Sequence, residues 1–249
     1  MLSFFHTTVY QPLYNILIFF YNIVPGGDFG VSIILITILL RTILIPLYKK
    51  QIESQKKLQE LQPKIKELQE KTKNNKEQQT KQLMELYKEH KTNPFSGCLP
   101  LIVQLIFLIA IYQVLITISN NGLVADPSQL YSFVSDPGKI NQFFIFLVDL
   151  TKPSIIIAAL AAIAQYFQTK MLMDKSSTAI DSSGHVLNKL HDEKNPDFAN
   201  IMTKQMLYLG PIMTLFIGIK FPAGLSLYWL AGTLFMLIQQ ILMEKKSKN

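Results

Sequence analysis

The stretch VSIILITILLRTILIPL, residues 31–47, is almost entirely apolar and contains Arg41, the only arginine among the 24 basic residues of the chain. An apolar run of about 20 residues can cross a bilayer as a helix, so residues 29–48 are predicted to form a membrane span. A charge at that depth costs roughly 3 kcal/mol or more. Unlike a lysine ammonium, a guanidinium is always protonated and offers five donors in a planar fork. The pattern therefore predicts a functional role for Arg41.

The composition of the whole chain is that of a membrane protein. Of its 249 residues, 49% are hydrophobic and only 16% are charged, which departs from the balance of soluble domains. Further apolar runs predict four more spans, at residues 93–118, 153–172, 205–221 and 225–243. We therefore expect an all-α polytopic membrane protein with five transmembrane helices, the last two joined as a tight hairpin at residues 222–224.

The distribution of lysine predicts the orientation in the membrane. Residues 49–91 contain twelve lysines and the tail 244–249 contains three, whereas residues 1–29 contain none. Since cytoplasmic segments carry the excess of basic residues, we expect the N-terminus outside a bacterial plasma membrane and the C-terminus in the cytoplasm. Residues 119–152 then form an outer loop and residues 173–204 a cytoplasmic loop. The cytoplasmic charge predicts contact with anionic lipids or with acidic partners such as ribosomal RNA.

Residues 1–28 are predicted to form an outer interfacial helix that ends at Pro25, Gly26 and Gly27. The aromatic side chains of Tyr10, Tyr14, Phe19, Phe20 and Tyr21 suit the headgroup region of a bilayer. The alternative is a sixth, short span, which would change the side of the N-terminus only. In the outer loop, residues 140–150 are apolar but too short to span, so we expect them at the interface as well.

Residues 49–92 are predicted to form a cytoplasmic helical hairpin. Leu58, Leu61, Ile65 and Leu68 are spaced three and four residues apart, which is a heptad pattern. Pro63 should kink this first helix. A second helix begins at about residue 76 and carries Leu83 and Leu86 on one side. The alternative is a solvated linker without packing.

Several polar residues lie within the predicted spans, where each needs a partner or water. None of the five spans contains Asp or Glu, so the sequence offers Arg41 no carboxylate at membrane depth. The candidate site residues are Arg41, Thr37, Gln104, Gln165, Gln168, Tyr228 and Trp229. If they converge, they form a hydrophilic groove. The alternatives are hydrogen bonds between helices for the Gln and Thr residues, snorkelling for Arg41, and packing or interface anchoring for the aromatic pair.

Motifs for covalent, metal-assisted or phosphate chemistry are absent from the sequence. It has no Ser–His–Asp pattern, no HExxH and no Gly-rich phosphate loop, and its four histidines lie outside the predicted spans. We therefore expect a protein that is not an enzyme, without cofactor or metal, and without DNA as a partner. A small multipass transporter or an anion channel that uses Arg41 for selectivity is one alternative. A scaffold that recruits a partner through the hairpin is another.

Four segments resemble a known family. They are ITILLRTILIPLYKKQIESQKKLQELQPKIKELQEK at 36–71, NPFSGCLPLIVQ at 93–104, FPAGLSLYW at 221–229 and IQQ at 238–240. Together, and in this order, they resemble the YidC-type membrane protein insertases of the Oxa/Alb/YidC superfamily, in a minimal bacterial form without the large outer domain.

The resemblance implies that Arg41 lies in a hydrophilic groove open to the cytoplasm and to lipid. It implies that the cytoplasmic hairpin is needed for activity and that the positions of Thr37 and Trp229 line the substrate path. The implied function is insertion of nascent membrane proteins into the bilayer without a cofactor. The ribosome and the Sec translocon are further expected partners.

Overall fold

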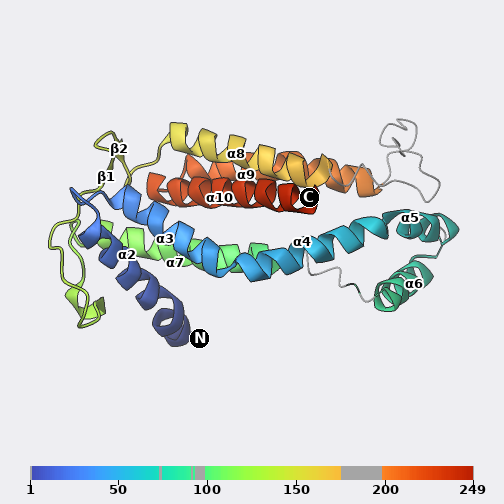
Figure 1. Ribbon diagram of the computed structural model, residues 1–249, viewed down its shortest axis with the longest axis horizontal. Coiled ribbons are helices and arrows are strands. Elements are labelled where there is room, and N and C mark those ends of the chain that lie inside the picture. Colours follow the sequence, from blue (N-terminus) through green and yellow to red (C-terminus); the bar gives the residue numbers. More distant parts are fainter. Residues whose placement is uncertain (1, 73–74, 91, 93–98, 175–197, 249) are drawn as a thin grey trace. The chain divides into compact units, whose positions relative to one another are not determined.

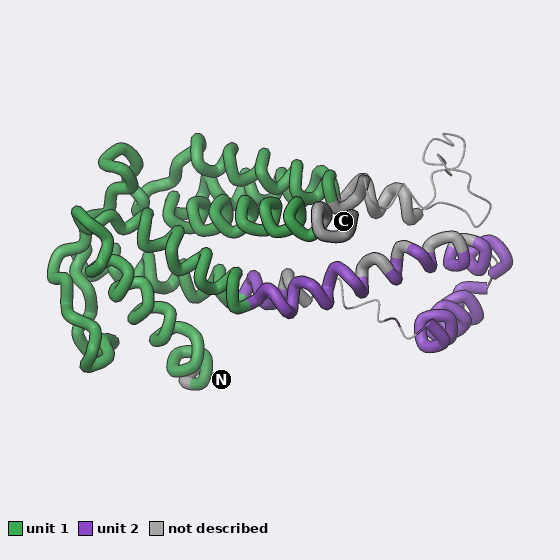
Figure 2. Tube along the Cα trace, in the orientation of Figure 1, with its two compact units in different colours: residues 1–43, 106–173, 192–249 green, residues 44–105, 174–191 purple. Residues whose placement is uncertain are grey.

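The computed structural model describes residues 2–72, 75–90, 92, 99–174 and 198–248 (Figure 1). It divides into two compact units (Figure 2). Unit 1 comprises Met1–Ile43, Ile106–Met173 and Asp192–Asn249, and unit 2 comprises Leu44–Leu105 and Asp174–His191. The expected start of the second span, at residues 93–98, and most of the expected cytoplasmic loop, 173–204, lie outside the described residues.

Unit 1 is built from helices and one small β-hairpin. Its elements are α1 (Leu2–Phe5), the π-helix η1 (His6–Tyr10), α2 (Gln11–Ile23), α3 (Phe29–Ile43), the larger part of α7 (Leu99–Asn120), the 3-10 helix η3 (Pro127–Gln129), β1 (Phe143–Phe144), β2 (Val148–Asp149), α8 (Ile155–Asp174), α9 (Phe198–Gly218) and α10 (Ala223–Lys248). Unit 2 contains α4 (Ile45–Glu60), α5 (Gln62–Lys71) and α6 (Lys76–Glu89).

The described helices include segments suited to a membrane. Ile102–Asn120 and Ala223–Met243 are long and apolar enough to cross it, and a third span results if α3 and Ile45–Ser54 act together. The apolar parts of α8 and α9, Ile155–Met171 and Leu207–Gly218, are shorter. The chain is thus a mostly helical protein with two or three candidate spans by length and composition.

The span predicted over residues 29–48 is interrupted in the structure, because α3 ends at Ile43 and α4 begins at Ile45. Pro46 explains this break. Its ring nitrogen carries no hydrogen for the helical bond, and its ring clashes with the carbonyl group four residues earlier, at Thr42. The apolar pattern alone did not place the break, since proline can also stand within the first turn of a helix.

The core of unit 1 lies between α2, α3, α7 and α10. Helix α3 packs against α2 on one side and α10 on the other, and α10 also packs against α9. The largest fully buried side chains of this core include Leu17, Ile33, Ile36 and Ile111. Helices α8 and α9 approach closely at Gly218, where an added Cβ would lie 2.6 Å from the Cβ of Ala158. Small residues allow such approach between helices in lipid, where packing rather than the hydrophobic effect drives association.

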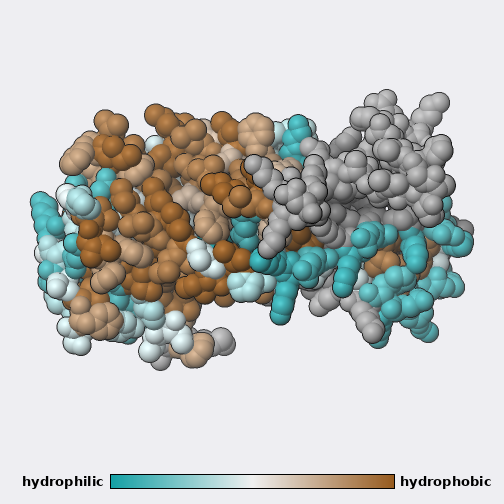
Figure 3. Space-filling view, viewed as in Figure 1, coloured by the Kyte–Doolittle hydropathy of each residue, from teal (hydrophilic) through white to brown (hydrophobic). Residues whose placement is uncertain are grey.

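The outward faces of these helices are strongly apolar, as Figure 3 shows for the visible face of unit 1. The exposed large side chains include Ile109 on α7, Leu160, Ile163 and Phe167 on α8, Leu209, Ile212 and Phe216 on α9, and Ile238 and Leu242 on α10. A soluble protein rarely exposes contiguous apolar surface on this scale. In a bilayer, this apolar surface would face hydrocarbon rather than water, at no cost in hydration.

The loop over residues 121–154 covers one end of unit 1, here called the loop end. Two tyrosines of α2 hold it, while a third tyrosine, at the end of η1, bonds to α7. Tyr10 Oη donates to Thr117 Oγ1 at 3.2 Å, while Tyr14 Oη accepts from the amide of Asp126 at 2.6 Å and Tyr21 Oη accepts from the amide of Asn141 at 2.7 Å. The loop and the helices are therefore one packed structure.

The expectation that Tyr10, Tyr14 and Tyr21 face lipid headgroups is wrong, because at most 8% of each is exposed. An amphipathic ring suits a membrane interface and a buried hydrogen bond to a loop equally well, so the sequence could not separate the two. Phe19, in contrast, is exposed as expected.

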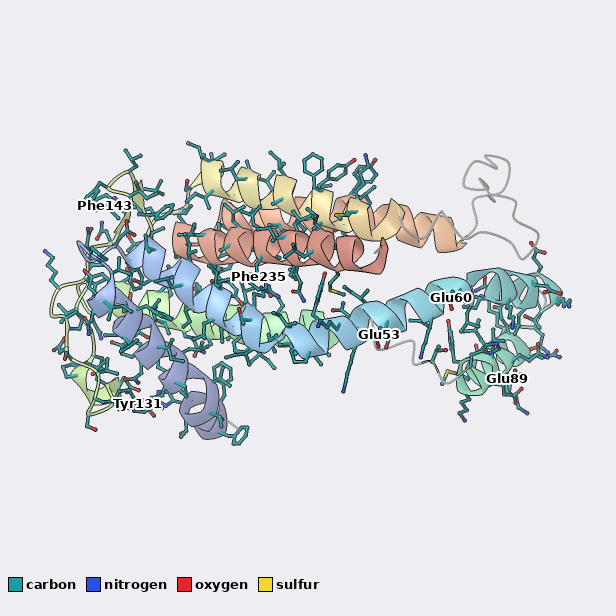
Figure 4. All side chains as sticks on the ribbon, in the orientation of Figure 1. Glu53, Glu60, Glu89, Tyr131, Phe143 and Phe235 are labelled. Atoms are coloured by element: carbon teal, nitrogen blue, oxygen red, sulfur yellow. The ribbon has the colours of Figure 1, made fainter. Side chains whose placement is uncertain are left out.

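The apolar segment 140–150 forms a β-hairpin in which Phe143 pairs with Asp149 and Phe144 with Val148. The Asp28 carboxylate joins this hairpin to α3, since Oδ1 accepts from the amide of Val31 and Oδ2 from the amide of Ile145. The hairpin tip exposes Ile145, Phe146 and Leu147. Phe143, labelled in Figure 4, lies on β1 at the loop end.

The same loop satisfies the first amides of α10, which have no partner within the helix. The amide of Ala223 donates to the carbonyl of Lys152 at 2.8 Å, and the amide of Gly224 donates to that of Leu150 at 3.0 Å. The carboxylate of Asp149 accepts from the amide and hydroxyl of Thr151 and forms an ion pair with Lys152. The loop thereby fixes where α10 begins.

Unit 2 consists of a short helical hairpin that follows α4. Helices α5 and α6 run antiparallel, because Gln79 Nε2 donates to the carbonyl of Gln69 near the turn and Lys64 Nζ lies 2.9 Å from His90 Nε2 at the far end. Asn75 caps α6 by accepting from the amide of Gln78.

The heptad side chains of this hairpin are buried to different extents. Leu61 and Ile65 are buried, whereas Leu58, Leu68, Leu83 and Leu86 are half-buried. The expected kink at Pro63 is instead a break at Leu61, between α4 and α5, with Pro63 as the second residue of α5. This position suits proline, whose missing N–H has no helical partner in the first turn.

The contact between Gly30 and Phe144 generates a stability prediction. A Cβ at Gly30 would lie 2.4 Å from Cδ2 and 2.6 Å from Cγ of Phe144. Gly30→Ala should therefore lower the free energy of unfolding by about 1–3 kcal/mol, the usual cost of overpacking, measured by thermal unfolding in detergent. The loss should be smaller in a Phe144→Gly background, which also removes the Phe144 Cβ that lies 2.7 Å from the added Cβ. Equal losses in both backgrounds would contradict the contact.

Candidate functional site

Arg41 lies in the last turn of α3 and is partly buried. Its Nη1 donates to the thioether sulfur of Met236 on α10 at 3.4 Å. Thioether sulfur is a weak acceptor and carries no charge. This contact orients the guanidinium group against α10.

Gly232 provides the space for this guanidinium group on α10. A Cβ built at Gly232 would lie 2.8 Å from Nη2, 3.1 Å from Nε and 3.3 Å from Cζ of Arg41. Gly232 and Met236 are four residues apart, so they lie on the same face of the helix. The planar group therefore rests against the helix where a side chain is missing.

Gln168 connects α8 to the same sulfur. Its Nε2 donates to Met236 Sδ at 3.5 Å. Met236 thus accepts from Arg41 of α3 and from Gln168 of α8. Three helices meet at one thioether, and two of the residues predicted from sequence are brought together there.

A second polar pair connects α8 and α9. Thr214 Oγ1 donates to Gln165 Oε1, and a Cβ at Gly210 would lie 3.0 Å from Gln165 Nε2. Gln165 and Gln168 are three residues apart on α8 and therefore neighbours on its surface. The two glutamines contact different helices, α9 and α10.

The other predicted site residues have different environments. Thr37 is completely buried, and its hydroxyl donates to the carbonyl of Ile33 within α3 at 2.6 Å. Tyr228 is 2% exposed, and Trp229 is half-buried. Gln104 is half-buried and lies in the part of α7 that belongs to unit 2.

Helix α10 also buries polar groups whose partners are not found among the described residues. Gln240, only 1% exposed, has neither amide atom in a hydrogen bond there, and the same holds for Gln239 Nε2 and Ser226 Oγ. An isolated amide in an apolar interior costs free energy unless it is hydrogen-bonded. Gln240 is four residues beyond Met236, so it continues the face that contacts Arg41.

The acidic side chains described in unit 1 are Asp28, Asp126, Asp136 and Asp149, and all lie in segments of the loop end or next to it. Glu53, Glu60 and Glu89, labelled in Figure 4, are on helices of unit 2. In the part of the chain that the structure describes, no three His, Cys, Asp or Glu side chains are grouped to hold a metal ion. The polar cluster therefore combines one fixed cation with amides, hydroxyls and a thioether.

Gly232 and Met236 were missed by the sequence analysis. A glycine in the interior of a helix costs about 1 kcal/mol relative to alanine, so Gly232 carried a signal for a close approach. Met236 carried none, because methionine is common in apolar helices as a gap filler. Gln240 was noted only as part of the IQQ segment.

The fold and this cluster define a helical membrane protein with a polar site around one arginine. The family model described as 60Kd inner membrane protein matches residues 19–249. The chain therefore belongs to this family, which confirms the resemblance drawn from the four sequence segments.

Similar proteins carry consistent names. The chain is 34% identical to the "Membrane protein insertase YidC" of Fusobacterium nucleatum over 96% of its own length and 98% of that protein. It is 31% identical to "Membrane protein insertase YidC" of Streptomyces avermitilis, covering 87% of the chain but 51% of that protein. It is also 31% identical to "Membrane protein insertase MisCA" of Bacillus subtilis, covering 88% of the chain and 71% of that protein.

Proposed function

We propose that this protein is a membrane protein insertase of the bacterial plasma membrane. The observation that carries the proposal is Arg41, a permanent cation that contacts Gly232 and Met236 of α10 within an apolar helical unit. The names of the relatives support it. The substrates on this proposal are nascent membrane proteins, and no covalent step or cofactor is involved.

The chemistry of the polar cluster suggests how a substrate is received. An outer segment of a nascent chain must move its polar backbone across hydrocarbon, where unsatisfied groups cost several kcal/mol each, on the order of 2–7. Amides such as those of Gln168 and Gln240 offer hydrogen bonds along part of this path. Arg41 attracts segments that carry Asp or Glu. The apolar segment that follows then moves into lipid, driven by burial of its own surface.

The aromatic and hydroxyl residues near this cluster would guide the guest segment. We place Trp229 and Tyr228 of α10 and Thr37 of α3 along its path, together with Gln165 and Gln168 of α8. For Gln104, which belongs to unit 2, a role in this path stays a prediction from the sequence. Trp229, half-buried, offers a broad apolar face with a polar edge. Such a surface suits a helix that slides past without one fixed register. Helices α3 and α10, which pack on each other, would form the sides of the path.

We propose that the hairpin of α5 and α6 receives the substrate or the ribosome on the cytoplasmic side. Its helices carry many exposed lysines and glutamates around a small buried centre at Leu61 and Ile65. Lysine side chains also suit anionic lipid headgroups. A Sec translocon is a further partner on this proposal.

We further propose five spans, with the N-terminus outside and the C-terminus in the cytoplasm. The asymmetry of lysine along the sequence supports this orientation. The exposed tip residues Ile145, Phe146 and Leu147 suit the outer interface, where the loop end would then lie.

Replacement of Arg41 tests the central proposal. Arg41→Ala should reduce insertion of a single-span substrate with an acidic outer segment about tenfold, equivalent to about 1.4 kcal/mol, in liposomes containing the purified protein. Arg41→Lys should keep part of the activity, because the charge remains while the planar fork is lost. Protease protection measures insertion. Wild-type rates for Arg41→Ala, at equal protein amounts, would refute the role of the charge.

Deletion of residues 54–89 tests the hairpin. The deleted protein should still accumulate in the membrane, because unit 1 has its own core, but it should lose insertion in the same liposome assay. The matched control replaces residues 54–89 with a flexible Gly/Ser linker of equal length, which should be equally inactive. Normal insertion by either variant would show that the hairpin is only a connection.

Thiol labelling tests the orientation. Glu77 is exposed at the start of α6, so Glu77→Cys in a Cys98→Ser background should react with a membrane-impermeant maleimide only after the cytoplasmic side is opened. A cysteine in place of exposed Ser128 in the outer loop should react in intact cells. The reverse pattern would invert the proposed topology.

A further inference from the structure

We infer that Gly232 and Met236 form a seat on α10 that positions the guanidinium group of Arg41, and that this seat determines how well acidic segments are received. The inference rests on the proposed function and adds two positioning residues to it. Neither residue was singled out by the sequence motifs.

The geometry of the seat has two complementary parts. The missing side chain at Gly232 admits the guanidinium plane, because a Cβ there would come within 3.3 Å of Nη2, Nε and Cζ at once. One turn further along α10, Met236 Sδ accepts from Nη1 at 3.4 Å. The first part limits where the plane can lie, and the second fixes its rotation.

The acceptor in the seat is a sulfur atom rather than a charged group. A thioether is a weak, neutral acceptor. It orients the cation but is displaced from it at little cost when a substrate carboxylate arrives.

Gln168 strengthens this arrangement from the neighbouring helix. Its Nε2 donates to the same sulfur at 3.5 Å, so the Met236 side chain is held from two sides. A flexible methionine would otherwise sample several rotamers. The position of Arg41 is thereby coupled to α8 as well as to α10.

The most direct test separates an effect on the position of the guanidinium group from an effect on the stability of the fold. Alanine favours helix more than glycine, and the atoms that an added Cβ would meet are the far end of a flexible arginine side chain. Gly232→Ala should therefore leave the midpoint of thermal unfolding unchanged or raised, while it displaces the guanidinium group. Met236→Leu removes the acceptor at nearly constant volume. Met243→Leu, the same change further along α10, is the matched control.

Because Arg41 is the only arginine, protein labelled with [15N]arginine gives a single side-chain Nε–Hε signal in detergent. We expect this signal to move in Gly232→Ala and in Met236→Leu, and to stay in place in Met243→Leu. An unmoved signal in both seat variants would overturn the seat, whatever the protein's activity.

Insertion in liposomes supplies the functional readout. Gly232→Ala should lower insertion of an acidic-segment substrate about threefold or more, as expected for coupled contact residues. Insertion of a matched substrate that carries Asn and Gln in place of Asp and Glu should be the same in Gly232→Ala as in the wild-type protein. In an Arg41→Ala background, Gly232→Ala should have no further effect. Equal losses for both substrates, or full additivity with Arg41→Ala, would overturn the inference. If Arg41→Ala alone inserts acidic substrates normally, the proposed role of the charge fails, while the NMR signal still decides the seat.

Discussion

A permanent positive charge held inside an apolar helical unit is the constraint on which the site depends. Arg41 cannot lose its proton, and the described helices around it offer amides, hydroxyls and a thioether. Helix α10 has a glycine, Gly232, where the guanidinium group lies, and the sulfur of Met236 accepts from Nη1. Helix α3 packs against α10, and Gln168 of α8 contacts the same methionine sulfur.

The two ends of α10 differ in how their polar groups are satisfied. At its start, the carbonyls of Leu150 and Lys152 accept from the first amides, and the loop itself is held by tyrosines of α2. About 25 Å further along the helix, at a rise of 1.5 Å per residue, Gln240 is buried without a partner among the described residues. Well-satisfied polar groups make an end rigid. Unsatisfied amides suit an end that water or a passing chain can occupy.

Several features of the fold and the site were predictable from the sequence, and the reasons are physical. Hydrophobic runs of sufficient length predicted helices that overlap α7, α8, α9 and α10, because a chain in lipid must satisfy its backbone within each helix. Arg41, Gln165 and Gln168 stood out because polar groups are costly in such runs. The break at Leu44, the β-hairpin at β1 and β2, and the burial of Tyr14 were not predicted. The break depends on how the helix accommodates Pro46, whereas the hairpin and the burial of Tyr14 depend on partners elsewhere in the chain.

The sequence by itself determined the class of protein, the position of its only arginine within an apolar run, and the family to which the chain belongs. These follow from the composition and from local apolar runs and motifs, which can be recognised without knowing the tertiary contacts. Only the tertiary structure decided that Arg41 lies on Gly232 and Met236, that Gln165 pairs with Thr214, and that Thr37 bonds within its own helix. Residues 41 and 236 are 195 positions apart. Such a contact depends on the rotation of each helix about its axis, which packing sets and local sequence does not.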